Sequence, residues 1–259
     1  MLYKKYLKMH IKSSMQYKFN IFLLGISSTL VSASEIISVW LLFQSFSSVG
    51  YWGFYEAALM FGIVTTVFSC VECFARGYDE FPTLIKEGSL DRLLVRPVNI
   101  YLQIFGSKIE FSRCGKILLG LTVSVIALCN LSISWTIWKA IVLILTFICG
   151  ILIIFGLMLI TAGVSVFTVE NLEFLNILTH GSKEICFYPI NIYTKWLARF
   201  FTFIVPVACF NYLPLNYIMG YGDLPQILCA FAPLIGMLFV IPCFLFFRWC
   251  LKKYQGTGT

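Results

Sequence analysis

Long runs of apolar residues, separated by shorter polar stretches, dominate the pattern of the chain. Five of these runs cover residues 19–43, 57–74, 117–133, 141–167 and 227–247, and a further run begins near Trp196. An α-helix needs about 20 apolar residues to cross the hydrocarbon core of a bilayer, which is about 30 Å thick. The pattern therefore predicts an all-α integral membrane protein with six transmembrane helices in a single domain, residues 1–259.

The composition supports this interpretation. Of the 259 residues, 59% are hydrophobic and 12% are charged, whereas an ordinary soluble domain is roughly half apolar and a quarter charged. The first apolar run is too long for the core of a signal peptide, so we expect it to remain as the first helix. Most of the ten cysteines fall in or beside apolar runs, where a free thiol packs as a small hydrophobe. Cys70 and Cys73 form a CxxC, which leaves a redox or metal role as the alternative.

The placement of lysine and arginine predicts the orientation, because cationic residues beside short loops stay on the cytoplasmic side. All but Lys139 of the 19 cationic residues agree with one topology. In that topology both termini, the loop 76–116 and the stretch with Lys183, Lys195 and Arg199 are cytoplasmic. The net charge of +7 is then explained by anionic lipid headgroups beside the helix ends. We therefore expect contacts with membrane lipids and none with nucleic acid.

Two polar segments are expected to form helices outside the spans. Residues 1–18 alternate lysines with apolar residues and predict an interfacial amphipathic helix, with a frayed basic tail as the alternative. In the loop 76–116, residues 81–94 have helix-forming character: Ser89 can cap an N-terminus, and Leu90, Leu93 and Leu94 recur on one face. Pro97 ends this helix. A second surface-lying helix is expected within residues 170–195.

The segment 206–225, between the last two predicted spans, is interrupted at Pro206, Pro214 and Gly220. Irregular backbone at membrane depth is tolerated only where it is buried in protein or lines a cavity. The segment, which also contains Asn211 and Tyr212, therefore predicts short re-entrant helices that enter from the outer face. An ordinary extracellular loop is equally compatible with the composition.

Two carboxylates, Glu35 and Glu72, fall inside predicted spans, where an ionised group must find a cation, water or a polar surface. Glu72 can pair with Arg76 one turn later on the same helix. Glu35 has no cation nearby in the sequence and shares its helix with hydroxyl residues that include Ser28 and Ser32. This polar stripe predicts either a translocation surface or a set of hydrogen bonds between packed helices.

Catalytic signatures are sparse. Histidine occurs twice in the chain, at well-separated positions, so no histidine-based metal site is expected. Gly115-Lys116 is followed by isoleucine, and the position five residues before Gly115 is Glu110, so the phosphate loop of nucleotide-binding proteins is not formed. We expect no catalytic residue, no metal and no cofactor bound by this chain, and any ATP and magnesium would have to bind a separate subunit.

The most specific stretch is GSLDRLLVRPVN, residues 88–99. It resembles the cytoplasmic signature of small ABC-2-type permeases, the membrane subunits of bacterial ABC exporters. The stretch IVPVACFNYLPLNYIMG, residues 204–220, is similar to a segment that these permeases carry between their last two spans. The resemblance covers nearly the whole chain in length, predicted topology and motif order.

The resemblance implies a multi-pass protein of the bacterial cytoplasmic membrane that dimerises with an identical or a different permease and docks on cytoplasmic ATPase subunits. A coupling helix would carry the contact, with the residues Gly88, Leu90, Asp91, Arg92, Leu94, Arg96 and Pro97. The cargo would be an amphipathic or hydrophobic drug-like compound, lipid or peptide, as in multidrug efflux. Two other hypotheses remain: an ion-coupled secondary transporter with Glu35 and Glu72 as proton sites, and a membrane enzyme that acts on lipids.

Overall fold

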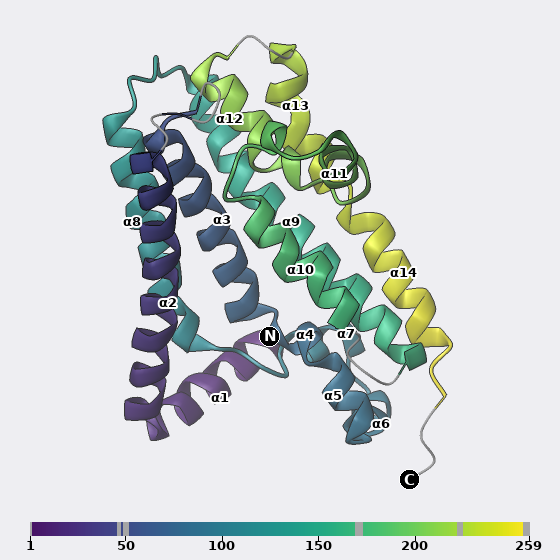
Figure 1. Ribbon diagram of the computed structural model, residues 1–259. Helices are drawn as coiled ribbons and strands as arrows, with labels where there is room; N and C mark the ends of the chain where they lie inside the picture. Colours follow the sequence, from purple (N-terminus) through teal and green to yellow (C-terminus); the bar gives the residue numbers. More distant parts are fainter. Residues whose placement is uncertain (1, 46–47, 49–51, 169–172, 222–224, 256–259) are drawn as a thin grey trace.

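The computed structural model describes residues 2–45, 48, 52–168, 173–221 and 225–255, and these residues form a bundle of helices (Figure 1). The first half contains α1 (Leu2–Gln16), α2 (Lys18–Ser45), α3 (Phe54–Phe74), α4 (Arg76–Asp79), α5 (Phe81–Lys86), α6 (Ser89–Leu94), α7 (Ile100–Phe105), the short η1 (Phe111–Arg113) and α8 (Cys114–Asn130). The second half contains α9 (Ile137–Thr168), α10 (Glu173–Ile185), η2 (Ile190–Ile192), α11 (Lys195–Arg199), the π-helical η3 (Phe200–Ile204), η4 (Val207–Cys209), α12 (Tyr212–Met219), α13 (Gln226–Met237) and α14 (Val240–Lys252).

Five helical stretches among the described residues are long and apolar enough to cross a membrane: α2, α3, η1 with α8, α9, and α13 with α14. The remaining predicted span, which was expected to begin near Trp196, is not one straight helix. Residues Lys195–Ile204 and Val207–Met219 form two arms bent by 75° at a short break. The count reaches six only if this bent pair is taken as one crossing. The all-α membrane fold is thus confirmed, and the sixth crossing stays a prediction.

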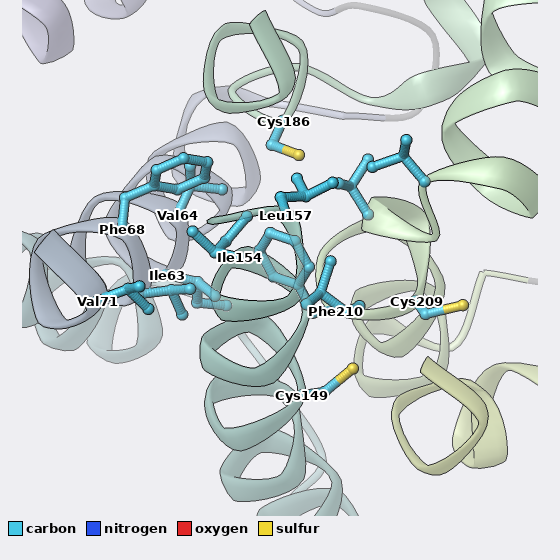
Figure 2. Packing of buried hydrophobic residues seen from close by; sticks show 14 of the residues in the cluster. Ile63, Val64, Phe68, Val71, Cys149, Ile154, Leu157, Cys186, Cys209 and Phe210 are labelled. Carbon is cyan, nitrogen blue, oxygen red and sulfur yellow. The ribbon is translucent and has the colours of Figure 1, made fainter. Parts of the chain in front are cut away.

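Helix α3 is the centre of the bundle. In its most apolar 18-residue window 89% of the residues are buried, compared with 6% for α2 and 17% for η1 with α8. Side chains of α3 such as Ile63 and Phe68 pack with Ile154 and Leu157 of α9 and with Phe210, which precedes α12 (Figure 2). Cys149, Cys186 and Cys209 belong to the same buried cluster, as expected for thiols that pack as small hydrophobes (Figure 2).

Helices α3 and α8 approach closely because small residues face each other between them. A Cβ atom on Gly62 would lie 2.8 Å from the carbonyl oxygen of Gly120, and a Cβ on Gly120 would lie 2.9 Å from the carbonyl oxygen of Gly62. Both distances are too short for a carbon atom. Thr66 and Ser124 continue the small-residue seam, and their hydroxyls bond to carbonyls of their own helices. In a bilayer, where lipid is as apolar as leucine, such close packing is a main source of helix association.

One end of the bundle gathers α4 to α7 together with α1 and the end of α14 (Figure 1). Helix α1 docks there, with the Tyr3 and Phe105 ring centroids 5.2 Å apart and His10 Nε2 2.9 Å from the carbonyl oxygen of Gly106. The predicted helix 81–94 is in fact two short helices, α5 and α6, because Gly88 adopts the left-handed φ of 63°. Ser89 does not cap α6, since its hydroxyl donates to the carbonyl of Leu84 at 3.1 Å.

Helix α10 differs from its prediction as a surface-lying helix. It packs against α9 and α3, and Thr179 and Ser182 on it are buried. Helix α11, which carries Lys195 and Arg199, lies at the end of the bundle occupied by α12 and α13, away from α4 to α7 (Figure 1). The cation pattern therefore misplaces this stretch relative to the loop 76–116. The cation pattern assumes that each lysine lies in a loop. It does not predict that Lys183 pairs with Glu35 on another helix.

The small-residue seam provides a first prediction. Replacing Gly62 or Gly120 by leucine should force α3 and α8 apart and lower the thermal unfolding temperature of the purified protein, because the backbones leave no room for a side chain. The matched control is Gly181→Ala, whose added Cβ would meet only Ile177, at an ordinary 3.5 Å. Equal unfolding temperatures for Gly62→Leu and the control would contradict the close packing.

Candidate functional site

A polar cavity of about 180 Å³ lies inside the bundle, among side chains of α2, α3, η1, α8 and α10 and the first residue of α4. Its lining residues are Ser32, Thr65, Phe68, Ser69, Glu72, Arg76, Arg113, Lys116, His180 and Lys183. We call this feature the polar cavity. Part of its wall comes from α2, α3 and η1 with α8, which belong to stretches long enough to span a membrane, and the rest comes from α10 and Arg76.

Glu35 finds its cation on a distant part of the chain. Lys183 of α10 donates to both carboxylate oxygens of Glu35, at 2.7 and 3.0 Å. Both side chains are largely shielded, with 14% of the lysine and 22% of the glutamate exposed. The pair joins two helices that lie 148 residues apart in sequence, and Lys183 thereby occupies the wall of the cavity instead of a loop.

The two predicted hydroxyls near Glu35 have different roles. Ser32 is fully buried and lines the cavity. Ser28 does not line it, because its hydroxyl lies 3.0 Å from the carbonyl of Gly25 and 3.2 Å from the carbonyl of Ser112. Ser28 therefore belongs to the contact between α2 and η1, which is the helix-packing alternative for this stripe. Ser32 stays a candidate for ligand contact.

Glu72 also has a different partner from the one predicted. The structure pairs its carboxylate with Arg113 at 3.2 Å, and the expected pairing with Arg76 on the next turn is replaced by other partners of that arginine. Arg76 lies 3.0 Å from Asp79 and 3.5 Å from Glu110. Glu110 in turn pairs with Arg113 at 3.1 Å. The charges at this end of the cavity are therefore linked in one network.

This network keeps Arg76 charged. Burial alone would lower the pKa of the guanidinium, but Asp79, Glu110, Glu72 and Glu80 together outweigh it, and the pKa of Arg76 is raised. The pKa of Asp79 is raised as well, because burial of its carboxyl exceeds the opposing effect of Arg76. The carboxylates that keep Arg76 charged also neutralise it, so Arg76 adds no net positive charge to the polar cavity.

Two hydroxyls in the cavity are left without a partner. Ser32 is 0% and Thr65 1% exposed, and neither hydroxyl oxygen has a hydrogen-bond partner among the described residues. Among the described residues, no carboxylate lies within ion-pair distance of Lys116. A buried polar group that forms no hydrogen bond costs about 1–3 kcal/mol. The cavity thus holds unused hydrogen-bonding capacity beside its cations.

The predicted coupling residues surround a second feature at the end that carries α4 to α7. Leu90 is fully buried in the chain's own core, so it cannot contact a partner, contrary to the prediction. Leu94 is 44% and Val95 85% exposed. The residues after them up to 99 are exposed as well, including Arg96 and Pro97. We call residues 94–99 the exposed hook. The surface that a partner could contact therefore begins at the end of α6 and continues beyond it, and it does not include the face with Leu90.

Gln103 of α7, which the sequence analysis missed, holds the exposed hook in place. Its side-chain amide donates to the carbonyls of Leu93 at 3.2 Å and Val98 at 3.0 Å. Asn99 caps the start of α7 by accepting from the backbone amide of Tyr101 at 3.0 Å. The signal in the sequence was a single glutamine in the apolar stretch IYLQIF. In the structure this glutamine is only 1% exposed. At the start of α6, Arg92 is exposed and Asp91 is half-buried.

The segment around η4 and α12 is buried rather than external. Asn211, Tyr212 and Pro214 are buried, and Pro206 is half-buried. The Asn211 side chain donates to the carbonyl of Cys186, which ties this segment to the chain after α10. Pro214 lies in the first turn of α12, where the missing amide hydrogen removes no helical bond. Irregular backbone here is enclosed by protein, as the sequence argument required.

The family of the chain is shown by comparison with known proteins. Residues 29–258 match the model of the ABC-2 family transporter proteins, which leaves out only α1, the beginning of α2 and the last residue. No curated protein gives a significant match to the chain.

The Glu35 pair provides a second prediction. Glu35→Gln should destabilise the protein by about 2 kcal/mol, because it leaves the Lys183 ammonium shielded and unpaired. The double variant Glu35→Gln with Lys183→Gln should lose less than the sum of the two single variants. Thermal or denaturant unfolding in detergent measures all three. Strict additivity would show that the two side chains do not interact.

Proposed function

The chain belongs to the ABC-2 family of transporter proteins, and on that premise we propose that it is the membrane-spanning permease subunit of an ATP-driven exporter. A separate cytoplasmic ATPase subunit would supply the energy and hold ATP and magnesium. The exposed hook is the main observation that supports the proposal. It presents Leu94, Val95 and Arg96 at the end of the bundle that the sequence places in the cytoplasm.

The hook is suited to transmit force because it is exposed on one side and fixed on the other. Its outer side offers apolar Val95 and cationic Arg96 to a partner. Its inner side is held by Leu90 in the core and by the two hydrogen bonds from Gln103. Movement of a docked ATPase would therefore move α6 and α7 together with the helices they pack against, without a flexible joint between them.

Dimerisation with an identical or a different permease fits the lateral surface of the bundle. Helix α2 and the α8 span are mostly exposed in the single chain, and apolar residues such as Phe22, Leu30 and Val125 face outward. This surface suits lipid and a second permease equally. We place the assembly in the bacterial cytoplasmic membrane with both termini and the hook in the cytoplasm, and α1 at the membrane surface. Family resemblance and the cation pattern support this placement.

The ion-coupled alternative has less structural support. A proton-coupled site needs a carboxylate that can release and accept a proton during transport. Glu35 is bonded to Lys183 and Glu72 to Arg113, so each carboxylate already neutralises a cation. Replacing either glutamate would therefore break an ion pair and lower the stability of the protein.

Charge and polarity changes in the exposed hook provide a third prediction. Val95→Asp and Arg96→Glu should each abolish co-purification with the ATPase subunit and transport, because they place a carboxylate in the contact while leaving core residues untouched. The measurement is mild-detergent purification followed by identification of the co-eluting chains, together with ATP-dependent efflux from vesicles.

Lys12→Glu is the matched control, since it reverses an exposed charge at the same end of the bundle on α1. Membrane insertion and the unfolding temperature should be unchanged in all three variants. If Val95→Asp and Arg96→Glu bind the ATPase and transport as well as Lys12→Glu does, the hook is not the coupling element.

A further inference from the structure

The polar cavity is asymmetric in charge. Four cationic side chains, Arg76, Arg113, Lys116 and Lys183, line it, against the single carboxylate of Glu72. Three of these cations are already paired with carboxylates: Arg76 with Asp79, Arg113 with Glu72 and Lys183 with Glu35. Lys116 is the lining cation that no described carboxylate pairs with, and at the short distances inside a protein its ammonium favours an anion over a cation.

The wall also holds hydrogen-bonding groups that an oxyanion could use. Ser32 and Thr65 carry buried hydroxyls without a partner among the described residues, and both line the cavity. Hydroxyl and cationic N–H groups donate to the several lone pairs of an oxyanion. Lys116 adds an ammonium that no described carboxylate pairs with. Donors thus converge from α2, α3 and α8 on one space.

The surroundings of the cavity indicate that the anion is attached to an apolar body. An apolar groove of about 400 Å³ follows the same two elements, α2 and the start of α8, and residues such as Phe22, Ile26, Leu30 and Phe111 line it. The groove and the cavity share no lining residue, but Thr29 of the groove lies one helical turn from Ser32 of the cavity, and Gly115 of the groove precedes Lys116. An acyl chain in the groove would therefore lie close to a charged group at the cavity.

From these observations we infer that the polar cavity binds the phosphate or carboxylate group of an anionic amphiphile. This assignment rests on the proposed function for its meaning in transport, where it narrows the cargo from amphipathic compounds in general to anionic ones. Drug-like cations are disfavoured, because the lining would repel them.

Lipid retention by the full-length permease tests the inference without the ATPase. The protein is incubated in detergent with equal amounts of phosphatidylglycerol and of a diacylglycerol with the same acyl chains, which lacks the phosphate, and retained lipids are counted by native mass spectrometry. We expect about tenfold preference for phosphatidylglycerol, which corresponds to one or two charge-assisted hydrogen bonds. Lys116→Gln should reduce the preference to about twofold or less, whereas Lys139→Gln, a cation outside the cavity bonded to Ser134, should leave it unchanged.

The double variant Ser32→Ala with Thr65→Val separates binding from folding. It removes two unpaired buried hydroxyls, so the unfolding temperature should be unchanged or higher while the lipid preference falls. A lower unfolding temperature would show that these hydroxyls are structural and would overturn their assignment to the ligand.

Inorganic phosphate distinguishes the two sources of the anion. If it raises the unfolding temperature of the wild type but not of Lys116→Gln, the cavity binds a free anion as well as a headgroup. The inference is overturned if the wild type shows no preference for phosphatidylglycerol and no response to phosphate, or if Lys116→Gln behaves as the wild type in both. If the variants fail these lipid and phosphate tests but the protein still binds the ATPase, the anion site is wrong and the proposed permease function is unaffected.

Discussion

The constraint on which the structure depends is the cost of a charge inside a membrane-spanning bundle. An ion taken out of water loses several kcal/mol unless a counter-ion and hydrogen bonds replace its solvent. Lys183 and Glu35 satisfy this constraint across α10 and α2, and Arg113 and Glu72 satisfy it across η1 and α3. The first pair ties α10 to α2, and Lys183, Arg113 and Glu72 of the two pairs line the polar cavity.

The same constraint explains why polar groups concentrate in one place. The apolar seam between α3 and α8 allows the backbones to touch at Gly62 and Gly120, which leaves no room for ligands. Farther along these helices the seam gives way to Thr65, Glu72 and Lys116 and to a cavity. The bundle thus combines tight packing at one level with an open polar cavity at another.

The exposed hook is the proposed contact between the bundle and its ATPase partner. It is anchored by Gln103 and Leu90, and both are almost fully buried. The ion network of Arg76, Asp79 and Glu110 lies between the short helices of this end and the cavity. Under the proposed function, movement of the hook would reach the cavity through the packing of α7 against α4, whose first residue, Arg76, lines the cavity.

The sequence by itself determined the all-α membrane fold, the positions of five apolar spans, the presence of helix within residues 81–94 and the family, because these depend on the length of apolar runs and on local motifs. It also located Glu35, Glu72 and Ser32 correctly as interior polar residues. Only the tertiary structure decided that Glu35 pairs with Lys183, that Glu72 pairs with Arg113, that α10 and α11 leave the predicted loop, and that Leu90 faces inward while Val95 faces outward. The physical reason is that pairing in a low-dielectric interior depends on which helices become neighbours, and residues 148 positions apart carry no local signal of that contact.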